Sequence, residues 1–351
     1  MGVMQFFAPI LAKNYEGGYA SAGFFRTLAP VGIVISILLT VLAIIGIWEK
    51  DQPKYFGIGG EVSEKVKLHE YVQIIRNNNP MQRLMVAGAG CKLALSIATN
   101  TTVLCMLYGC MMGSYDGLYL PMMVLGYVFS VPFFLLTVRT SQKEGQKASL
   151  MKYVSVAFIC YIGVLVLLLF WGRSDAFTLS IMGANGLSIN LYTILFIAFF
   201  GIGYGAYYAT ADMPIPMVAD CSDYETYRSG SYIPGIMGTL FSLVDKLVSS
   251  LSATVVGIAV SFIGLESLPT QYDPYTPGMN WVVIVLFCII PMVAWAATLI
   301  AMKGYTLTGE KMKEIQAVNA CRRDAVANGM KLEEAMTKWQ SMDQLPAEYR
   351  S

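Results

Sequence analysis

Seven segments of this chain are long and apolar enough to cross a membrane, and this feature decides the fold class. A helix needs about 20 apolar residues to span the hydrocarbon core of a bilayer. Only 13% of the 351 residues are charged, roughly half the share of about 25% in soluble domains. The sequence therefore predicts an all-α polytopic membrane protein with seven full spans. The spans cover residues 27–48, 84–108, 118–138, 153–172, 188–211, 233–264 and 280–302.

Composition argues against several other classes of protein. The formal net charge is +1, so no basic surface for nucleic acid is expected. The chain has one histidine, His69, and its seven cysteines form no CxxC pair. These counts argue against a histidine metal site, a Ser-His-Asp triad and a disulfide framework. Neither GxGD nor HExxH occurs in the sequence, so we do not expect an enzyme.

Lysine and arginine are distributed unevenly between the two sides of the membrane that the spans define. Nineteen of the 24 lie in the tail after residue 302 and in three connections, 49–83, 139–152 and 212–232. The opposite side has three, and two lie within spans. Because cytoplasmic segments are enriched in basic residues, we expect a multi-pass protein of the plasma (inner) membrane with a cytoplasmic C-terminus.

With seven spans and a cytoplasmic C-terminus, residues 15–25 are expected to lie outside the cell. The apolar residues 1–12 precede them. This first stretch is too short to cross a bilayer. It also has neither the basic region nor the cleavage site of a signal peptide. It is predicted to be the outer end of a helix that begins before Met1, so the sequence indicates an N-terminally truncated chain.

The polar tail, residues 303–351, is predicted to be a cytoplasmic amphipathic segment. Thr308 is placed to cap a helix, and Glu310 in the first turn favours the helix dipole. We expect this helix to continue to Trp339 and to lie on a surface or at an interface. Its apolar positions are Met312, Ile315 and Val318.

Two adjacent charged residues, Asp245 and Lys246, lie inside an apolar span. A charge at the centre of a membrane helix costs at least about 2.5–3.5 kcal/mol, so it needs an explanation. Lys246 shares its helix face with Ser242, Ser249 and Ser250. Such a face is typical of a water-filled cavity that binds a hydroxyl-rich solute. The alternative interpretation is a structural ion pair with another helix.

Two further polar features lie within spans. Lys92 is about eight residues into its span, and Ser96 and Asn100 follow on the same helix face. We expect this face to line a cavity or to contact another helix. Tyr204 belongs to a Gly-rich stretch with two more tyrosines, which indicates either an interfacial belt or a sugar-stacking or gating role.

Residues 213–230, MPIPMVADCSDYETYRSG, are expected to form a short cytoplasmic loop between two spans. The segment concentrates Asp220, Asp223, Glu225 and Arg228. Its composition alone is typical of a solvated loop. The order of its residues is more specific than its composition.

That order resembles the signature of the glycoside–pentoside–hexuronide:cation symporters, the melibiose-carrier branch of the major facilitator superfamily. The characteristic lysine in the family's following helix corresponds to Lys246. Two other stretches are similar to the family, NNNPMQR at 77–83 and YTLTGEKMKEI at 305–315. The resemblance therefore covers essentially the whole chain. The matching signature residues are Ala219, Asp220, Asp223, Tyr224, Glu225, Tyr227 and Arg228.

The resemblance implies a major-facilitator-type helical bundle. Family members have twelve helices, and this chain corresponds to the last stub of helix 5 and to helices 6–12. Residues 1–48 would end the N-terminal half, residues 49–83 would be the central cytoplasmic loop, and residues 84–302 would be the C-terminal six-helix half. That half would contain a three-plus-three inverted repeat, and the tail 303–351 would follow it.

The resemblance also implies a secondary active transporter in a lipid bilayer. It would couple uptake of a sugar, glycoside or uronide to Na⁺ or H⁺ by alternating access. No cofactor is implied beyond the coupling cation, and no metal site. In the family the carboxylates that bind the cation lie on the first four helices, which this chain does not contain.

Two sets of candidate site residues follow from these arguments. The polar residues within the spans provide the substrate-binding candidates, and the resemblance provides those that hold the cytoplasmic side closed. The substrate-binding candidates are Lys246, Ser242, Asp245, Tyr204 and Lys92. The candidates for the cytoplasmic gate are Asp220, Asp223, Tyr224 and Arg228.

Two alternative functions stay open at this point. A truncated half-transporter would lack the partner surface across which alternating access occurs and would have no independent transport activity. A seven-helix receptor with an outside N-terminus fits the number of spans. However, the final span, 280–302, lacks the lysine of retinal-binding receptors.

Overall fold

The computed structural model describes most of the chain in two compact units, Met1–Val62 and Ser63–Ser351. Most of the predicted central loop 49–83, with His69, lies outside the described residues, as do several positions of the predicted helix end 1–12. The described residues are 7–8, 10–16, 18, 21–49, 73, 75–183, 186–187 and 189–350.

Among its described residues, the first unit has one long apolar helix, α2 (Ala22–Ile47). At 1.5 Å per residue, its 26 residues reach roughly 39 Å, which exceeds the hydrocarbon core of about 30 Å. The most apolar stretch of α2 has no buried side chain. Such a surface is stable in lipid or against other apolar helices, so α2 fits the first predicted span.

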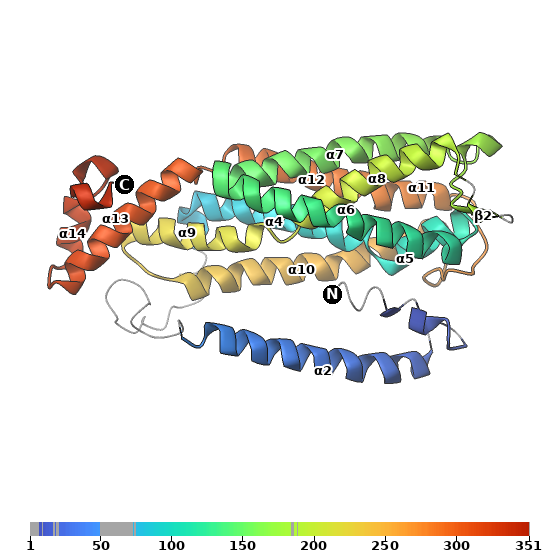
Figure 1. Cartoon of the computed structure of the whole chain (residues 1–351), viewed down its shortest axis with the longest axis horizontal. Coiled ribbons are helices and arrows are strands. Elements are labelled where there is room, and N and C mark those ends of the chain that lie inside the picture. Colours follow the sequence, from blue (N-terminus) through green and yellow to red (C-terminus); the bar gives the residue numbers. More distant parts are fainter. Residues whose placement is uncertain are drawn as a thin grey trace. The chain divides into compact units, whose positions relative to one another are not determined.

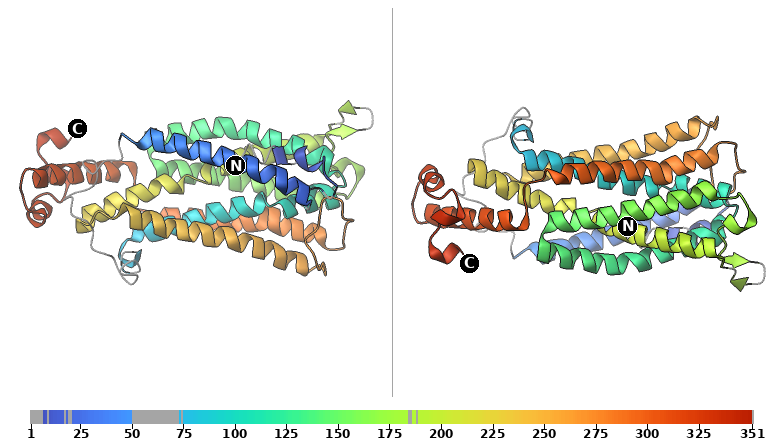
Figure 2. Two further views of the ribbon diagram at one scale, coloured as in Figure 1. Left: turned by 90° about the horizontal axis from the view of Figure 1, so that it is seen from below. Right: turned by 90° about the horizontal axis from the view of Figure 1, so that it is seen from above.

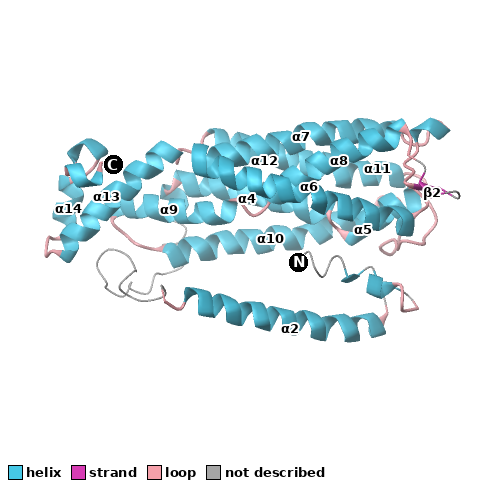
Figure 3. Cartoon of the chain, viewed as in Figure 1, coloured by secondary structure: helices cyan, strands magenta, loops and turns pink. Residues whose placement is uncertain are grey.

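The second unit is a bundle of long helices (Figures 1 and 3). One end of the bundle carries the C-terminal tail, and we call it the tail end. In the described parts of both units together, six helices are long and apolar enough to span a membrane. A pair of helices joined at a bend of 46° makes a seventh span. The predicted all-α polytopic fold is therefore confirmed. The bundle helices are α4 (Asn79–Ala98), α5 (Thr101–Leu104), η3 (Cys105–Met111), α6 (Tyr115–Glu144), α7 (Gln146–Phe170), α8 (Leu191–Thr210), α9 (Pro214–Ser229), α10 (Pro234–Ser261), α11 (Met279–Ile284), η5 (Val285–Ile289) and α12 (Ile290–Lys303).

The bundle helices pack in two matching groups (Figure 2). Helix α4 packs against α10 and α12, and α8 packs against α6 and α7. Contacts between α7 and α12 join the groups. The first group thus joins α4 to two helices from near the end of the chain, whereas the second group consists of successive long helices. The largest fully buried side chains between these helices include Trp295, Tyr108, Tyr161, Phe196 and Phe287.

The bent span consists of α4, α5 and the π-helical η3. Asn100 accepts a hydrogen bond from the Thr102 backbone N at 2.9 Å and thereby caps α5. The expectation that Asn100 continues the polar face of Lys92 is therefore wrong. A capping side chain turns back to the free amides of the helix start, and here it also marks the break between two helices.

Two of the predicted connections between helices are largely helical. Gly145 alone separates α6 from α7, so most of the predicted connection 139–152 is helical. The expectation of a loop at 213–230 is wrong, because α9 fills most of it. Pro214 is compatible with α9 because the first turn of a helix needs no backbone donor. Gly230, at φ 74°, ends α9 in the left-handed conformation that glycine favours.

Other short elements connect the long helices on the opposite side from the tail end. A short 3₁₀ helix, η4 (Asp175–Phe177), follows α7. It is followed by a two-stranded antiparallel hairpin of β1 (Met182–Gly183) and β2 (Gly186–Leu187), in which Met182 pairs with Leu187.

The tail folds into short helices that pack on one another. Thr308 caps α13 (Gly309–Ala327) by accepting from the Lys311 backbone N, as predicted. The helix does not continue to Trp339, because Gly329 takes a left-handed φ of 92° that ends it. The predicted stripe is buried, and Val318 belongs to a separate small apolar core. The remaining tail elements are α14 (Leu332–Lys338), η6 (Met342–Gln344) and η7 (Ala347–Tyr349).

The packing of α4 against α12 depends on a glycine at their contact. A Cβ on Gly90 would lie 2.5 Å from the carbonyl oxygen of Ala294 and would also collide with Thr298. We predict that Gly90→Ala lowers the free energy of unfolding by about 1–3 kcal/mol through overpacking. The matched control is Gly238→Ala on α10, where nothing lies within 4 Å and alanine favours the helix. Equal thermal stability of the two variants in detergent would contradict this packing.

Candidate functional site

The charged residues inside the membrane form one cluster between α4 and α10. Lys92 Nζ lies 3.4 Å from Asp245 Oδ1, and Lys246 Nζ lies 3.8 Å from Asp245 Oδ2. The side chains of Lys92 and Asp245 are 23% and 22% exposed, whereas that of Lys246 is 81% exposed. Two ammonium groups therefore share one carboxylate, and only the Lys246 side chain is largely exposed.

The cluster lies at a similar depth on both helices. Measured along the helix axis, Lys92 lies about 20 Å from Asn79, the first residue of α4. Asp245 lies about 17 Å from Pro234, the first residue of α10. Both distances fall well inside a spanning helix of about 30 Å. An ion pair with another helix was the alternative interpretation of Asp245, and Lys92 is that partner.

Serines extend the polar surface along α10. The Ser249 hydroxyl donates to the Asp245 carbonyl at 2.8 Å, and the Ser250 hydroxyl donates to the Lys246 carbonyl at 3.0 Å. Their protons are engaged, so each oxygen remains available as an acceptor. Ser242 is exposed one turn before Lys246. The predicted polar face of α10 is thus present, and it follows the helix for about two turns.

Tyr204 lies in a separate aromatic cluster. Its ring contacts those of Phe200, Tyr207 and Tyr208 on α8 at centroid distances of 5.4, 5.1 and 5.5 Å. Tyr127 on α6 adds an edge-to-face contact at 6.2 Å. Among the described residues, the ring contacts recorded for Tyr204 are all within α6 and α8. The structure therefore does not bring Tyr204 together with the charge cluster.

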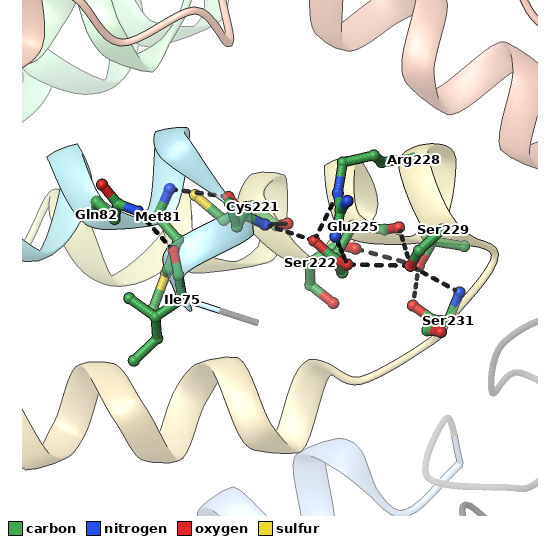
Figure 4. A network of polar contacts seen from close by, with 11 residues as sticks. Ile75, Met81, Gln82, Cys221, Ser222, Glu225, Arg228, Ser229 and Ser231 are labelled. Carbon is green, nitrogen blue, oxygen red and sulfur yellow. Dashed lines mark hydrogen bonds and ion pairs between the residues drawn. The ribbon is translucent and has the colours of Figure 1, made fainter. Parts of the chain in front are cut away.

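A second polar site lies at the tail end and is centred on Glu225 (Figure 4). The Glu225 side chain is only 3% exposed. It accepts from Arg228 Nη2 at 2.6 Å, from Asn78 Nδ2 at 3.0 Å and from the Ser229 hydroxyl at 3.0 Å. The guanidinium of Arg228 is thus held by a residue on its own helix. We call these four residues the Glu225 network.

Asn78 links this network to the start of α4. Its side-chain oxygen accepts from the Met81 backbone N at 2.9 Å and so caps α4, while Nδ2 also donates to the Cys221 carbonyl at 3.3 Å. The Cys221 thiol lies 3.7 Å from the Tyr305 hydroxyl. Three of the similar stretches, around 77–83, 219–228 and 305–315, therefore meet at the tail end.

The other gate candidates lie on α9 and make contacts outside this network. Asp220 accepts a long hydrogen bond of 3.4 Å from Gln146 Nε2 at the start of α7. At Asp223 the backbone carbonyl, not the carboxylate, accepts from Asn319 Nδ2 on α13 at 2.9 Å. Tyr224 is half-buried against the apolar core. A cavity of about 470 Å³ opens nearby between α6 and the junction of α8 and α9, lined partly by Gln146 and Asp212.

Arg322 fastens the tail to α9. It is 3% exposed, and it donates to the Tyr227 carbonyl at 2.7 Å and to the Trp339 carbonyl at 2.7 and 2.9 Å. Burial lowers the pKa of the Arg322 guanidinium from its usual value. The Tyr227 ring lies between Arg322 and Lys311, at 5.3 and 5.2 Å from their charged groups. The Tyr227 hydroxyl donates to the Gln340 carbonyl at 2.6 Å.

We predict that Arg322→Ala releases the tail from α9. The change leaves one buried and one partly buried backbone carbonyl without these donors, at a cost of about 2–3 kcal/mol. Limited proteolysis should then cut the tail at least several-fold faster than in the wild type. Arg323→Ala is the matched control, because the Arg323 side chain is 58% exposed. Equal cleavage of both variants would show that Arg322 does not hold the tail.

Three residues of these sites, Asn78, Glu225 and Arg322, are not among the predicted site candidates, although Asn78 and Glu225 lie in stretches that resemble the family. A signal exists for two of them. Asn78 stands directly before Asn79-Pro80, a typical helix start, and Glu225 stands three residues before Arg228, a spacing that pairs charges on a helix. For Arg322 no local pattern indicates burial, because its partners lie elsewhere in the chain.

Comparison with known proteins decides the family. A family profile described as MFS/sugar transport protein matches residues 1–309. The chain belongs to this family. Membership in the major facilitator superfamily agrees with the number and length of the spanning helices. It identifies an integral membrane protein of a sugar-transporter family, which argues against the receptor alternative.

One curated relative has been found in Pseudescherichia vulneris. It is described as an uncharacterized 29.9 kDa protein in the crtE 3' region and is 28% identical over 124 residues. The match covers 35% of this chain and 43% of the relative. This similarity therefore adds no activity to that of the family.

Proposed function

We propose that the protein is a secondary active transporter that couples uptake of a sugar, glycoside or uronide to Na⁺ or H⁺ by alternating access. The four stretches that resemble the glycoside–pentoside–hexuronide:cation symporters support this branch of the family. In this proposal the tail end faces the cytoplasm and the membrane is the plasma (inner) membrane.

The single observation that supports the proposal most strongly is the cluster of Lys92, Asp245 and Lys246. Charged side chains within spanning helices are costly and mark substrate or ion pathways. Here the exposed Lys246 lies between Ser242 and Ser250 on one face of α10. An ammonium flanked by hydroxyl groups is suited to a hydroxyl-rich solute, since both kinds of group form directional hydrogen bonds with it.

The tail-end residues have a different proposed role. Asp220, Asp223 and Tyr224 lie on α9, and we assign to them the contact that closes the cytoplasmic side. Arg228 contributes by holding Glu225, and through Glu225 it fixes α9 against the start of α4. The aromatic cluster of Tyr204 then serves as the packing between α6 and α8 beside the pathway.

The experiment is uptake of labelled glycosides into proteoliposomes that contain the protein purified from the membranes of its native cells. An inward Na⁺ gradient or an inward H⁺ gradient is imposed separately, with an ionophore that dissipates each gradient as the control. Accumulation that is several-fold higher with one gradient, and that disappears with the ionophore, is the expected result. Uptake that reaches the same level with and without gradients would refute coupled transport.

A further inference from the structure

The charge cluster carries one more positive charge than negative charge. Two lysines, Lys92 and Lys246, share Asp245. Among the described residues, Asp245 is the only carboxylate within 4 Å of either ammonium. A net charge at this depth in a membrane protein costs several kcal/mol unless a counter-charge is present. The cluster therefore lacks one negative charge.

The excess charge is located on Lys246. Lys92 is closer to the carboxylate, at 3.4 Å against 3.8 Å, and less than a quarter of its side chain is exposed. Lys246 has 81% of its side chain exposed. The inner pair, Lys92 and Asp245, is thus largely neutralised within the protein. Lys246 keeps most of its donor capacity for a group outside the bundle.

The surface around Lys246 is suited to a carbohydrate. Ser242 and Ser250 lie one turn before and one turn after Lys246, each about 6 Å away along the helix. The Ser250 oxygen remains an acceptor, because its proton is donated to a backbone carbonyl. Directly beside this polar stripe lies a stripe of exposed leucines. They are Leu243, Leu247 and Leu251.

We infer that this cluster binds a carbohydrate with one carboxylate in preference to the neutral sugar of the same shape. The carboxylate accepts from the Lys246 ammonium and provides the missing charge. Sugar hydroxyl groups donate to serine oxygens along α10, and Asp245 remains paired with Lys92. This inference rests on the proposed sugar-transport function and specifies its substrate class.

The test compares ligands that differ only at carbon 6 of the sugar. Equilibrium binding to the purified full chain is measured with p-nitrophenyl-β-D-glucuronide against the glucoside, and with the matching galacturonide against the galactoside. For at least one pair, the acidic sugar should bind ten-fold or more tightly than the neutral sugar. Lys246→Gln should remove the preference, because binding of the acidic sugar should fall about ten-fold more than binding of the neutral sugar. Lys143→Gln, an exposed lysine in the last turn of α6, should preserve the preference.

The outcomes separate this inference from the proposed function. Equal or stronger binding of the neutral sugars would overturn the acidic preference and leave sugar transport standing. A preference that survives Lys246→Gln would overturn the assignment to Lys246. Absence of binding by all four glycosides would contradict the proposed function and the inference together.

Discussion

Replacing Glu225 by alanine should lower the free energy of unfolding by about 3 kcal/mol. The Glu225 carboxylate is buried and accepts hydrogen bonds from Asn78, Arg228 and Ser229. Alanine would leave the Arg228 guanidinium and the Asn78 amide without this acceptor. Because Asn78 also caps α4, the loss should loosen the start of α4 as well as α9. Thermal unfolding in detergent measures the effect.

Two further variants make this prediction specific. Glu225→Gln keeps one acceptor oxygen but loses the charge, so its stability should fall between those of the wild type and Glu225→Ala. Glu310→Ala on α13 removes an exposed carboxylate and should change stability by less than about 0.5 kcal/mol. If Glu225→Ala is as stable as Glu310→Ala, the network does not hold α9 in place.

Removing the negative charge of the membrane cluster should have the second large effect. Asp245→Asn leaves Lys92 between two helices without its counter-charge. Breaking a fully buried pair costs about 3–5 kcal/mol. Since about a fifth of each side chain is exposed, we expect a loss of about 2 kcal/mol in stability. Transport should fall at least ten-fold, because the position of Lys246 depends on the same carboxylate.

A double variant separates the effect of an uncompensated charge on stability from the effect of losing the carboxylate itself. Lys92→Met combined with Asp245→Asn contains no unpaired buried charge, so its stability should return close to that of the wild type. Asp175→Asn, in the exposed η4, is the control and should have no effect. A double variant as unstable as Asp245→Asn would refute the ion pair.

The fold was largely predictable because spanning helices can be recognised in a sequence as long apolar segments. Every predicted span coincides with a helix or with a helix pair of the structure. The segment at 213–230 was the main error. Its prolines and charges favour a loop by composition, but Pro214 fits a first helical turn, and buried contacts of Glu225 stabilise the rest of α9.

The residues of the charge cluster could be identified from the sequence, but the contacts between them could not. Asp245 and Lys246 are easily identified because charged residues are rare in an apolar span. However, no residue near Asp245 in the sequence indicates that Lys92 is its partner. Asn78 and Glu225 are similarly remote, 147 positions apart. Pairing over such separations is decided by the packing of whole helices, which one sequence does not specify.

Sugar counterflow tests most directly whether the charge cluster takes part in transport, in proteoliposomes that contain equal amounts of the wild-type protein or of Lys246→Ala. Counterflow needs substrate binding and alternating access but no cation gradient, so it isolates the role of the cluster. We expect counterflow of at least one labelled glycoside by the wild type, and none above empty liposomes by Lys246→Ala, with equal membrane insertion of both. Unchanged counterflow by Lys246→Ala, or none by the wild type, would contradict this role of the cluster.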